Sequence, residues 1–557
     1  MRTRLLSGNE AVALGAWEAG VAVGCGYPGT PSTEILETLA RQPEVYTEWS
    51  VNEKVALEVG VGAALAGGRA LVTMKHVGVN VAADPLFTAA YTGVRAGLVI
   101  VTADDPDMHS SQNEQDNRNY AIAAKVPMLE PSDSAEAREF TKLAFELSEA
   151  HDTPVFLRLT TRLSHSKSLV DAFPDGAPVR TPAPIEPGFV ADPRKYVMIP
   201  GHARLRRRAL AERWVALEEL AETHPANRIE RSSAGPAPIG VITSGIPYTY
   251  VKEVAPDLPV LKLGLVHPLP RRLVEQFAAS VGRLYVVEEL DPVIETRLKA
   301  WGIDCIGKDA FPAIGEFTPA IVAAGLGVDT GGEALAPAIE VPVRRPGLCP
   351  GCPHDHVFNE LRRHDMIVSG DIGCYSLGVL PPYNAMDTLL DMGASLTMAQ
   401  GMDVVAPPDQ KGRIAAVIGD STFAHSGITG LLNAVWNGHD GLYIVLDNGT
   451  TAMTGMQPNP MSGERIGREE APSVDYELLA RAFHLPAENV GMVDAYDTGA
   501  ISAAIDELAP RSGVRLLVVV GLCLIEGQKL KKLDRLTGRK DLRRELIALH
   551  PVGGPRE

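Results

Sequence analysis

The sequence predicts an α/β protein made of several doubly wound parallel-sheet domains. Short apolar runs at residues 70–74, 98–102 and 155–159 alternate with segments of helical periodicity, which is typical of parallel strands buried under helices. Turn-forming segments follow these runs, and the first of them reads Lys75-His76-Val77-Gly78. Because ligands of such sheets bind at the carboxyl ends of the strands, we expect functional residues in these turns.

The length of 557 residues is enough for about three or four domains. A charged, helix-prone stretch after residue 190 and a proline-rich connector before residue 347 indicate the boundaries. The predicted organisation is an α/β domain at 1–190, a charged linker or helical insert at 191–236, a second α/β domain at 237–335, a third at 347–525, and a tail at 526–557.

Charge and hydropathy exclude several classes of protein. The formal net charge of −17 argues against nucleic acid as the main partner, since phosphate binding needs a positive surface. No apolar run is long enough to span a bilayer and no secretion signal is evident, so we expect a cytoplasmic protein with no membrane partner. In that compartment the six cysteines are expected as thiols or metal ligands and not as disulfides.

The strongest chemical pattern lies in the third domain. An apolar strand at 414–418 runs into Gly419-Asp420-Ser421, and another at 442–446 runs into Asp447-Asn448-Gly449-Thr450. The spacing from Asp420 to Asn448 suits a strand, a helix and a strand, so we expect both clusters at neighbouring strand ends. Either cluster alone would indicate only a tight turn after a strand.

Together these residues suit a magnesium diphosphate. Mg²⁺ prefers oxygen ligands, which the Asp420 carboxylate, the Asn448 amide and the Thr450 carbonyl can supply, and Gly419 lets a diphosphate approach the backbone. The pattern resembles the signature of thiamine diphosphate enzymes, Gly-Asp-Gly followed at a fixed interval by Asn-Asn. Ser421 replaces the second glycine and Asp447 the first asparagine, and neither change removes a proposed ligand. The resemblance implies a thiamine diphosphate-binding fold.

The N-terminal domain resembles the pyrimidine-binding domain of 2-oxoacid:ferredoxin oxidoreductases. The matching segments are Gly26 to Thr33, with its Tyr-Pro-Gly-Thr-Pro sequence, and Glu48 to Lys54, which leads into a helix of small residues. The resemblance implies that Glu53 activates the cofactor and that Thr30 contacts the oxoacid. From its place in the turn after a strand, His76 is a candidate to orient the substrate carboxylate or to act as an acid.

Other interpretations of these residues remain open. On physical grounds alone Glu53 would be an exposed glutamate favoured by the dipole of the helix that it begins, and Glu48 and Glu58 are weaker candidates for the same role. His76 can equally be an ordinary loop histidine.

Four of the six cysteines form a possible metal site. Cys349-Pro350-Gly351-Cys352 is followed by Cys374 and, far downstream, by Cys523. Four thiolates could bind zinc or a [4Fe–4S] cluster, and their spacing does not separate the two. The resemblance implies the cluster. Cys523 is the least secure ligand, because a single cysteine after a strand is usually a buried apolar residue.

The resemblance is to large (alpha) subunits of indolepyruvate:ferredoxin oxidoreductases, within the 2-oxoacid:acceptor oxidoreductase family. Besides the segments above, it rests on three segments: Met74 to Asn80, Ser110 to Arg118, and Cys349 to His356. It implies that Asn113, Glu114 and Arg118 lie near the cofactor or substrate, although a structural polar loop is an alternative. It makes residues 237–335 a domain like the C-terminal domain of transketolase, and Cys25 and Cys305 structural thiols.

The implied reaction is the oxidative decarboxylation of an aryl 2-oxoacid such as indolepyruvate with coenzyme A. The products are an arylacetyl-CoA and CO₂, and the electrons pass through the cluster to ferredoxin or another acceptor. A small beta- or gamma-type subunit is an expected partner, in a hetero-oligomer with a dimeric core. Such large subunits often end in a ferredoxin-like domain with two cysteine-rich runs, whereas no cysteine follows Cys523 here, so the electrons are expected to pass to a partner.

Two other functions compete with this hypothesis. A non-oxidative thiamine diphosphate decarboxylase or synthase would not need the four cysteines. A non-catalytic assembly subunit would use them to bind a structural zinc ion.

Overall fold

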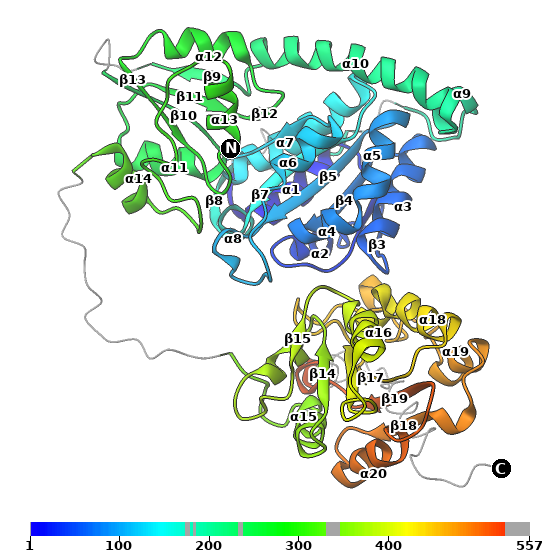
Figure 1. Cartoon of the computed structure of the whole chain (residues 1–557). Coiled ribbons are helices and arrows are strands. Elements are labelled where there is room, and N and C mark those ends of the chain that lie inside the picture. Colours follow the sequence, from blue (N-terminus) through cyan, green and yellow to red (C-terminus); the bar gives the residue numbers. More distant parts are fainter. Residues whose placement is uncertain (1, 173–178, 182–184, 232–237, 330–345, 530–557) are drawn as a thin grey trace. The chain divides into compact units, whose positions relative to one another are not determined.

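The computed structural model describes residues 2–172, 179–181, 185–231, 238–329 and 346–529 (Figure 1). The chain divides into two compact units, Met1–Ile339 and Glu340–Glu557, here called unit 1 and unit 2. Most of the predicted proline-rich connector and of the predicted tail lies outside the described residues. None of the helices in the described ranges is long and apolar enough to cross a membrane.

Unit 1 is built around a seven-stranded sheet with the order β12-β6-β7-β5-β4-β2-β3. All neighbouring strands are parallel except β12 and β6, which are antiparallel. The strands are β2 (Val23–Gly26), β3 (Tyr46–Trp49), β4 (Ala70–Lys75), β5 (Leu98–Asp104), β6 (Met128–Leu129), β7 (Val155–Thr160) and β12 (Leu265–His267). Every residue of β4, β5 and β7 is buried, which explains their continuous apolar sequences.

Helices cover this sheet and place the loops at its edge. Val72, Met74 and Ile100 join one hydrophobic core with α3 (Glu53–Leu65) and α5 (Ala83–Thr92), while α7 (Ser134–Ala150) packs on β5 and β7 beside α1 (Gly8–Glu18). The shorter helices are α2 (Thr33–Leu39), α4 (His76–Val81), α6 (Arg118–Ala124) and α8 (Thr161–His165). A separate two-stranded antiparallel sheet pairs β1 (Arg2–Ser7) with β8 (Lys167–Ala172).

The second predicted α/β domain lies in the same compact unit as the first. Its sheet has the order β13-β10-β11-β9. The strands are β9 (Arg228–Glu230), β10 (Ile239–Ser244), β11 (Val260–Leu263) and β13 (Arg283–Val287), and the helices are α11 (Gly245–Val254), α12 (Arg271–Ala278), α13 (Val293–Ala300) and α14 (Pro319–Leu326). The strand β12 lies between β11 and β13 in the chain, but it joins the edge of the seven-stranded sheet instead. The predicted charged insert contains the short α9 (Pro193–Tyr196) and the long α10 (Pro200–Thr223), which packs on α5 and α12.

Unit 2 contains one parallel sheet with the order β15-β14-β16-β17-β19-β18. Its strands are β14 (Ile367–Gly370), β15 (Thr388–Leu389), β16 (Ile414–Gly419), β17 (Gly441–Asp447), β18 (Val490–Asp494) and β19 (Val514–Val520). Its helices are α15 (His354–Arg363), α16 (Ala394–Val405), α17 (Asp420–Thr422), α18 (Ile428–Asn437), α19 (Tyr476–Ala482) and α20 (Thr498–Leu508).

Successive residues of β16 belong to different cores. Val417 packs in a core with residues of α15 and α20, and Ile418 in a second core with residues of α16 and α18. Because neighbouring side chains of a strand point to opposite faces, the sheet has helices on both sides. This arrangement confirms the predicted doubly wound α/β fold.

Candidate functional site

The two polar clusters of unit 2 lie at the ends of adjacent strands. β16 and β17 are parallel and in register, with Gly419 opposite Leu446. Asp420 and Asn448 therefore follow directly at the same edge of the sheet, and only 2% and 7% of their surfaces are exposed. The sequence prediction that strand, helix and strand would bring these two residues to one edge is confirmed.

Hydrogen bonds hold the two clusters together. The Asn459 amide donates to Oδ2 of Asp420 over 3.0 Å, and the Thr450 N–H donates to Oδ1 of Asn448 over 3.1 Å. The Thr451 hydroxyl donates to that of Ser421 over 2.8 Å and so links the two segments. The result is a buried set of carboxylate and amide oxygens, which suits a hard cation such as Mg²⁺.

Gly419 packs against an aromatic ring. A Cβ atom at this position would lie 2.6 Å from Cε1 of Tyr375, so any larger residue would displace that ring. Tyr375 belongs to the short helical segment Cys374–Val379, which begins with a cysteine of the predicted cluster site. The glycine therefore joins the predicted diphosphate segment to the cysteine region.

Asp371 is a buried residue of this edge that sequence reasoning missed. It follows β14 and accepts hydrogen bonds from the backbone N–H groups of Ile372, Gly393 and Ser395, over 2.8 Å, 2.8 Å and 3.0 Å. Burial raises its pKa to about 6. It holds the start of α16 against the loop that leads to Cys374, and its place directly after a strand was the signal that could have indicated it.

The four predicted cluster cysteines line one cavity of unit 2. Cys349, Cys352, Cys374 and Cys523 share this cavity of about 80 Å³ with His354 and Asn448. Cys349 and Cys352 lie in the turn before α15, Cys374 follows β14, and Cys523 follows β19. Cys25 and Cys305 are buried in the hydrophobic core of unit 1, as expected for structural thiols.

The electrostatics of these thiols depend on what fills the cavity. Burial, together with the neighbouring cysteines, raises the pKa of Cys352 to about 11 and that of Cys374 to about 12. Thiolates at neutral pH therefore need a positively charged group beside them, as a metal centre supplies. As they stand, these thiols line the cavity but are not grouped closely enough to hold a metal ion, and the same is true of every other set of His, Cys, Asp and Glu side chains in the described part of the chain, so binding a cluster would require the thiols to move closer together.

His354 and Asn448 form the wall between the thiols and the diphosphate segment. The Asn448 amide donates to Nε2 of His354 over 3.3 Å, and burial lowers the pKa of His354 to about 4, so the ring is neutral and accepts this bond. The backbone N–H of Cys523 donates to the carbonyl of Asn448 over 3.0 Å. Asn448 thus contacts both predicted sites, a link that the sequence alone did not indicate.

In unit 1, Glu53 is buried at the start of α3. Only 5% of its surface is exposed, and Asn52 caps the helix by accepting the N–H of Val55 over 3.0 Å. A Cβ atom on Gly78 of α4 would lie 2.6 Å from Oε1 of Glu53, so the carboxylate packs directly on this glycine. The interpretation of Glu53 as an exposed first-turn glutamate is therefore wrong.

The two alternative glutamates have other surroundings. Glu58 is exposed and forms an ion pair with Lys54 one turn before it on the helix. Glu48 is partly exposed and accepts hydrogen bonds from the hydroxyls of Tyr46 and Ser50, both over 2.7 Å.

His76 begins α4 at the end of β4 and is fully buried. Its Nε2 lies 3.0 Å from Oδ1 and 3.2 Å from the carbonyl oxygen of Asn113. Because both partners are acceptors, Nε2 carries the proton and Nδ1 is an acceptor. Burial and the charge of Lys75 lower the pKa of the ring, which keeps it neutral.

The predicted substrate loop lies beside the segment that covers His76. Thr30 is half-buried, and its carbonyl accepts a hydrogen bond from the Ser110 hydroxyl over 3.5 Å. The Thr33 hydroxyl accepts the N–H of Gly29 over 3.1 Å and so closes the turn. The loops around Thr30 and Ser110 therefore meet at the carboxyl end of the seven-stranded sheet.

Lys75 is a second residue that sequence reasoning missed. It is 9% exposed, and its ammonium donates to the carbonyl of Ser110. In the described ranges it forms no ion pair, and burial lowers its pKa to about 8 while Asp105 opposes that shift. A buried ammonium without a carboxylate partner is costly, so it is a candidate to bind an anion. Its place at the end of an apolar strand was the available signal.

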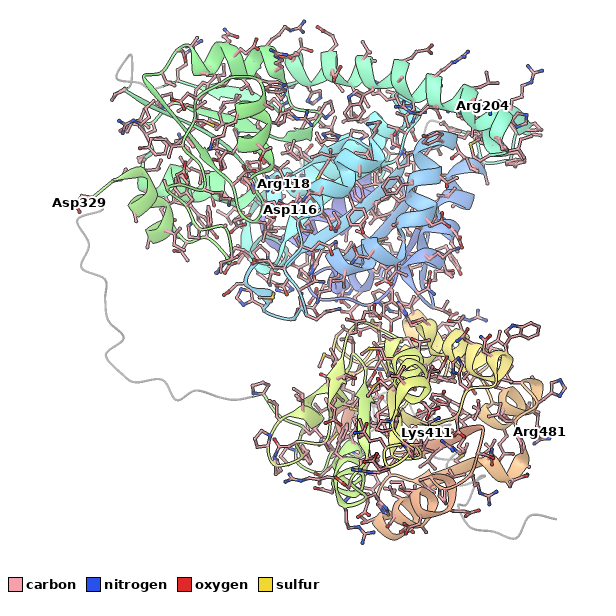
Figure 2. All side chains as sticks on the ribbon, viewed as in Figure 1. Asp116, Arg118, Arg204, Asp329, Lys411 and Arg481 are labelled. Carbon is pink, nitrogen blue, oxygen red and sulfur yellow. The ribbon has the colours of Figure 1, made fainter. Side chains whose placement is uncertain are left out.

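Of the three polar residues predicted near the cofactor, only Asn113 contacts another predicted site residue, His76. Glu114 accepts the backbone N–H groups of Asp107 and Gly315. Arg118 is buried and forms ion pairs with Asp116, 2.5 Å away, and with Glu288, 2.6 Å away; Figure 2 labels Asp116 and Arg118. For Glu114 and Arg118, these contacts join the loop to the second sheet of unit 1.

Family models of known proteins match one segment of each unit. Residues 14–204 match the family described as pyruvate flavodoxin/ferredoxin oxidoreductase, thiamine diphosphate-binding. Residues 371–519 match the family described as thiamine pyrophosphate enzyme, C-terminal TPP binding domain.

Curated relatives are similar over nearly the whole chain. An indolepyruvate oxidoreductase subunit IorA of Archaeoglobus fulgidus is 41% identical, over 93% of this chain and 86% of the relative. The IorA subunit of Methanothermobacter thermautotrophicus is 44% identical, over 86% and 80%. That of Thermococcus kodakarensis is 40% identical, over 94% and 86%.

Proposed function

We propose that this chain, which belongs to the family of IorA subunits of indolepyruvate oxidoreductases, catalyses the oxidative decarboxylation of aryl 2-oxoacids with coenzyme A. The family and the two matched domains make it a thiamine diphosphate-dependent 2-oxoacid oxidoreductase. The finer proposal is that an aryl 2-oxoacid such as indolepyruvate gives an arylacetyl-CoA and CO₂, and that the electrons leave through a [4Fe–4S] cluster.

One observation supports the oxidative reaction most strongly. Four cysteines from three separate parts of unit 2 line a cavity whose wall includes Asn448 of the diphosphate segment. A non-oxidative decarboxylase has no use for such thiols, and a structural zinc site has no need to lie against the cofactor segment. When bound there by Cys349, Cys352, Cys374 and Cys523, a [4Fe–4S] cluster supplies a one-electron acceptor.

The oxygen ligands of unit 2 fit a magnesium diphosphate. We assign Asp420, Asn448 and the carbonyl of Thr450 to Mg²⁺, and Gly419 and Ser421 to the diphosphate. Thiamine diphosphate supplies a nucleophilic carbon and an electron sink for the loss of CO₂. The burial of Asp420 and Asn448 excludes water from their oxygens, which strengthens their interaction with a cation.

Glu53 and His76 act in unit 1 as hydrogen-bonding groups. The Glu53 carboxyl group, held on Gly78, would hydrogen-bond to the aminopyrimidine ring of the cofactor and so favour the imino tautomer that removes the thiazolium C2 proton. His76 has its acceptor nitrogen Nδ1 buried, and in the described residues that atom has no hydrogen-bond partner. Its neutral ring therefore suits the acceptance of a proton or a hydrogen bond better than the role of an acid.

Lys75 and Thr30 are the groups that we assign to the oxoacid. Lys75 has a buried ammonium that forms no ion pair in the described residues, and we assign it to bind the substrate carboxylate. Thr30 lies in the loop that contacts Ser110, whose carbonyl accepts the hydrogen bond from Lys75. A carboxylate beside Lys75 offsets the cost of burying its charge. This pair selects 2-oxoacids over neutral aldehydes or ketones.

The remaining components are partners. A small beta- or gamma-type subunit completes the enzyme in a hetero-oligomer, and ferredoxin or another acceptor takes the electrons. The name of the relatives as subunits supports this part of the proposal.

The experiment that tests the proposal is metal and activity analysis of anaerobically purified protein, prepared with its small subunit. We expect about four iron and four sulfide per chain and a reduction of viologen dye that needs both an aryl 2-oxoacid and coenzyme A. Zinc in place of iron would support the non-catalytic assembly subunit. Decarboxylation without dye reduction would support the non-oxidative enzyme.

A further inference from the structure

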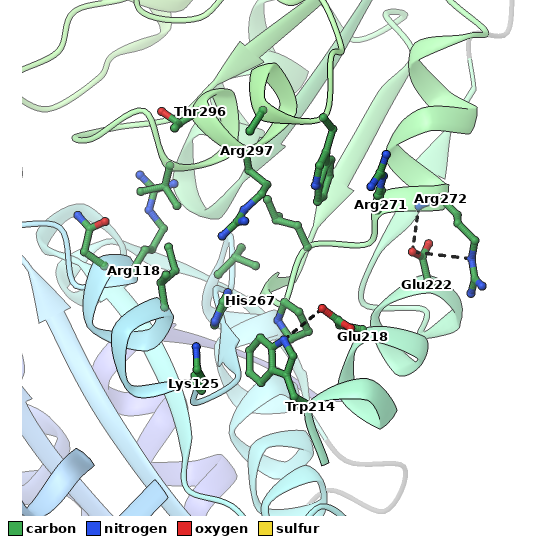
Figure 3. Close-up of a pocket in the computed structure, with 18 of the residues that line it drawn as sticks. Arg118, Lys125, Trp214, Glu218, Glu222, His267, Arg271, Arg272, Thr296 and Arg297 are labelled. Carbon is green, nitrogen blue, oxygen red and sulfur yellow. Dashed lines mark hydrogen bonds and ion pairs between the residues drawn. The ribbon is translucent and has the colours of Figure 1, made fainter. Parts of the chain in front are cut away.

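Unit 1 contains a large cleft between its seven-stranded and four-stranded sheets. Its lining includes none of the residues assigned above to the reaction. Its volume is about 1080 Å³, and α6, α10, α12 and α13 contribute to its walls together with the segment around His267 (Figure 3). Such a volume is large enough for a ligand of nucleotide size.

Two cations in this cleft have no acidic partner. Lys125 and Arg297 line the cleft near His267 (Figure 3), and in the part of the chain that the structure describes neither forms an ion pair. Both charges act on His267, whose pKa burial lowers to about 3 with a further contribution from Arg297 and Lys125. Two like charges around a neutral ring repel each other, and a bound anion would relieve this repulsion.

The acids that line the cleft are already engaged. Glu219 pairs with Arg272, and Glu222 accepts the backbone N–H groups at the start of α12. Glu218 accepts the indole N–H of Trp214, and Asp291 accepts the side-chain amide of Asn119. Glu218, Glu222 and Asp291 keep their own negative charge, but in the described residues none of these acids pairs with Lys125 or Arg297, so both cations remain available to an anion.

Two indole rings complete the lining. Trp214 stacks on His267 with ring centroids 4.7 Å apart, and the guanidinium of Arg271 lies 5.6 Å from the ring centroid of Trp301. Both tryptophans are partly exposed in the cleft. An indole ring stacks on a planar base and a neighbouring cation attracts phosphate, so the two together suit the two parts of a nucleotide.

We propose that this cleft binds the phosphates of a nucleotide on Lys125 and Arg297 and its base on the tryptophans. Two sources share this chemistry: a free nucleotide such as ADP, and the nucleotide part of coenzyme A. The inference does not depend on the proposed reaction, because binding is measured without a 2-oxoacid.

The test is calorimetric titration of the full-length protein with ADP, coenzyme A and pyrophosphate, each in saturating thiamine diphosphate and Mg²⁺. Saturation keeps these anions out of the predicted cofactor site. The variants are the double substitution Lys125→Gln with Arg297→Gln, and Trp214→Leu. The matched control is Arg283→Gln, an exposed arginine at the start of β13 that does not line the cleft.

We expect the double variant to weaken binding of nucleotide and pyrophosphate by about tenfold for each cation removed. Arg283→Gln should bind like the wild type, and Trp214→Leu should lose affinity for ADP but not for pyrophosphate. Binding of ADP alone assigns the cleft to a free nucleotide, and binding of coenzyme A with the same loss in the double variant assigns it to the co-substrate. Failure of the wild type to bind any of the three ligands at millimolar concentration overturns the proposal, as does equal binding by the double variant with an unchanged circular dichroism spectrum.

Discussion

The carboxyl ends of the two large sheets carry opposite chemistry on similar topology. In unit 1 the groups at the end of β4 are a buried ammonium, Lys75, and a neutral imidazole, His76. In unit 2 the groups beyond β16 and β17 are oxygens of Asp420 and Asn448, with four thiols nearby. The first edge suits an organic acid and the second suits metal cations, so one fold presents two complementary environments.

The two edges also differ in how their polar groups are satisfied. Lys75 has one carbonyl partner, and Nδ1 of His76 has no hydrogen-bond partner in the described part of the chain. Asp420 and Asn448 are held by Asn459 and by the N–H of Thr450. Substitutions at the two edges should therefore have different effects. In unit 2 they should abolish binding of a metal centre, and in unit 1 they should weaken substrate binding or slow the reaction.

The largest effect is expected from Cys374→Ser. A serine hydroxyl is a poor ligand for iron, so the iron content should fall to background, and 2-oxoacid-dependent dye reduction with it. Metal analysis and dye reduction of the anaerobically purified variant measure both. Cys305→Ser, a buried thiol of unit 1, is the matched control and should retain its iron. Full iron content in Cys374→Ser would remove this residue from the proposed ligand set.

The next effect concerns the activating carboxylate of unit 1. Glu53→Gln keeps the size of the side chain but removes its ability to exchange a proton with the pyrimidine ring, and kcat should fall by about 10²–10⁴-fold. Thiamine diphosphate binding, followed by protein fluorescence, should stay within a few-fold of the wild type. The control is Glu58→Gln on the exposed side of the same helix. A larger loss in Glu58→Gln than in Glu53→Gln would transfer the role to Glu58.

A smaller effect is expected at the oxygen ligands of unit 2. Asp420→Asn removes the one carboxylate that we assign to Mg²⁺, so the affinity for thiamine diphosphate at fixed Mg²⁺ should fall by about 100-fold. Raising the Mg²⁺ concentration should restore part of it. Asp409→Asn, an exposed aspartate in a loop of the same unit, is the control. Unchanged affinity in Asp420→Asn would show that this carboxylate does not bind the metal.

The smallest effect is expected at Lys75. Lys75→Met should raise KM for the 2-oxoacid about tenfold with kcat much less affected, since it removes one charge-assisted hydrogen bond to the carboxylate. Lys75→Arg, which keeps the charge, should recover part of the loss. Steady-state kinetics with a 2-oxoacid and with the corresponding neutral aldehyde measure the discrimination. An equal rise of KM for both compounds would mean that Lys75 only shapes the loop.

The same residue predicts a pH dependence. Burial lowers the pKa of Lys75 to about 8, so the ammonium is present below that pH and is lost above it. KM of the wild type should therefore rise as the pH increases through about 8, while KM of Lys75→Arg should stay level because arginine keeps its proton. A level KM in the wild type up to pH 9 would contradict the assignment.

The sequence predicted the fold class and most of the site because those features are local. Apolar runs followed by turns identified the strands, and the spacing from Asp420 to Asn448 indicated neighbouring strand ends. The cysteine segments were recognisable as possible ligands for the same reason. Burial was not recognisable, because the exposure of a helix N-terminus depends on what packs over it. Glu53 became distinct from Glu58 only where α4 placed Gly78 on its carboxylate.

Long-range contacts account for what sequence reasoning missed. His354 contacts Asn448, which lies 94 residues further along the chain, and Asp371 accepts hydrogen bonds from Gly393 and Ser395. A long-range contact also joins the first two predicted domains, because β12 belongs to the second domain in sequence but pairs with β6 of the first. Such contacts join residues far apart in the chain, and a local pattern carries no information about them.

By itself the sequence determined which residue types follow each strand, and therefore the kinds of ligand that each sheet edge can bind. The tertiary structure decided which of those residues share one site. It gathered Cys523 with the other three thiols, joined them to the diphosphate segment through Asn448, and left Lys75 and the pair of Lys125 and Arg297 without acidic partners in the described residues. The physical reason is that ligand chemistry is a property of side chains, whereas burial and unbalanced charge arise only when distant elements pack together.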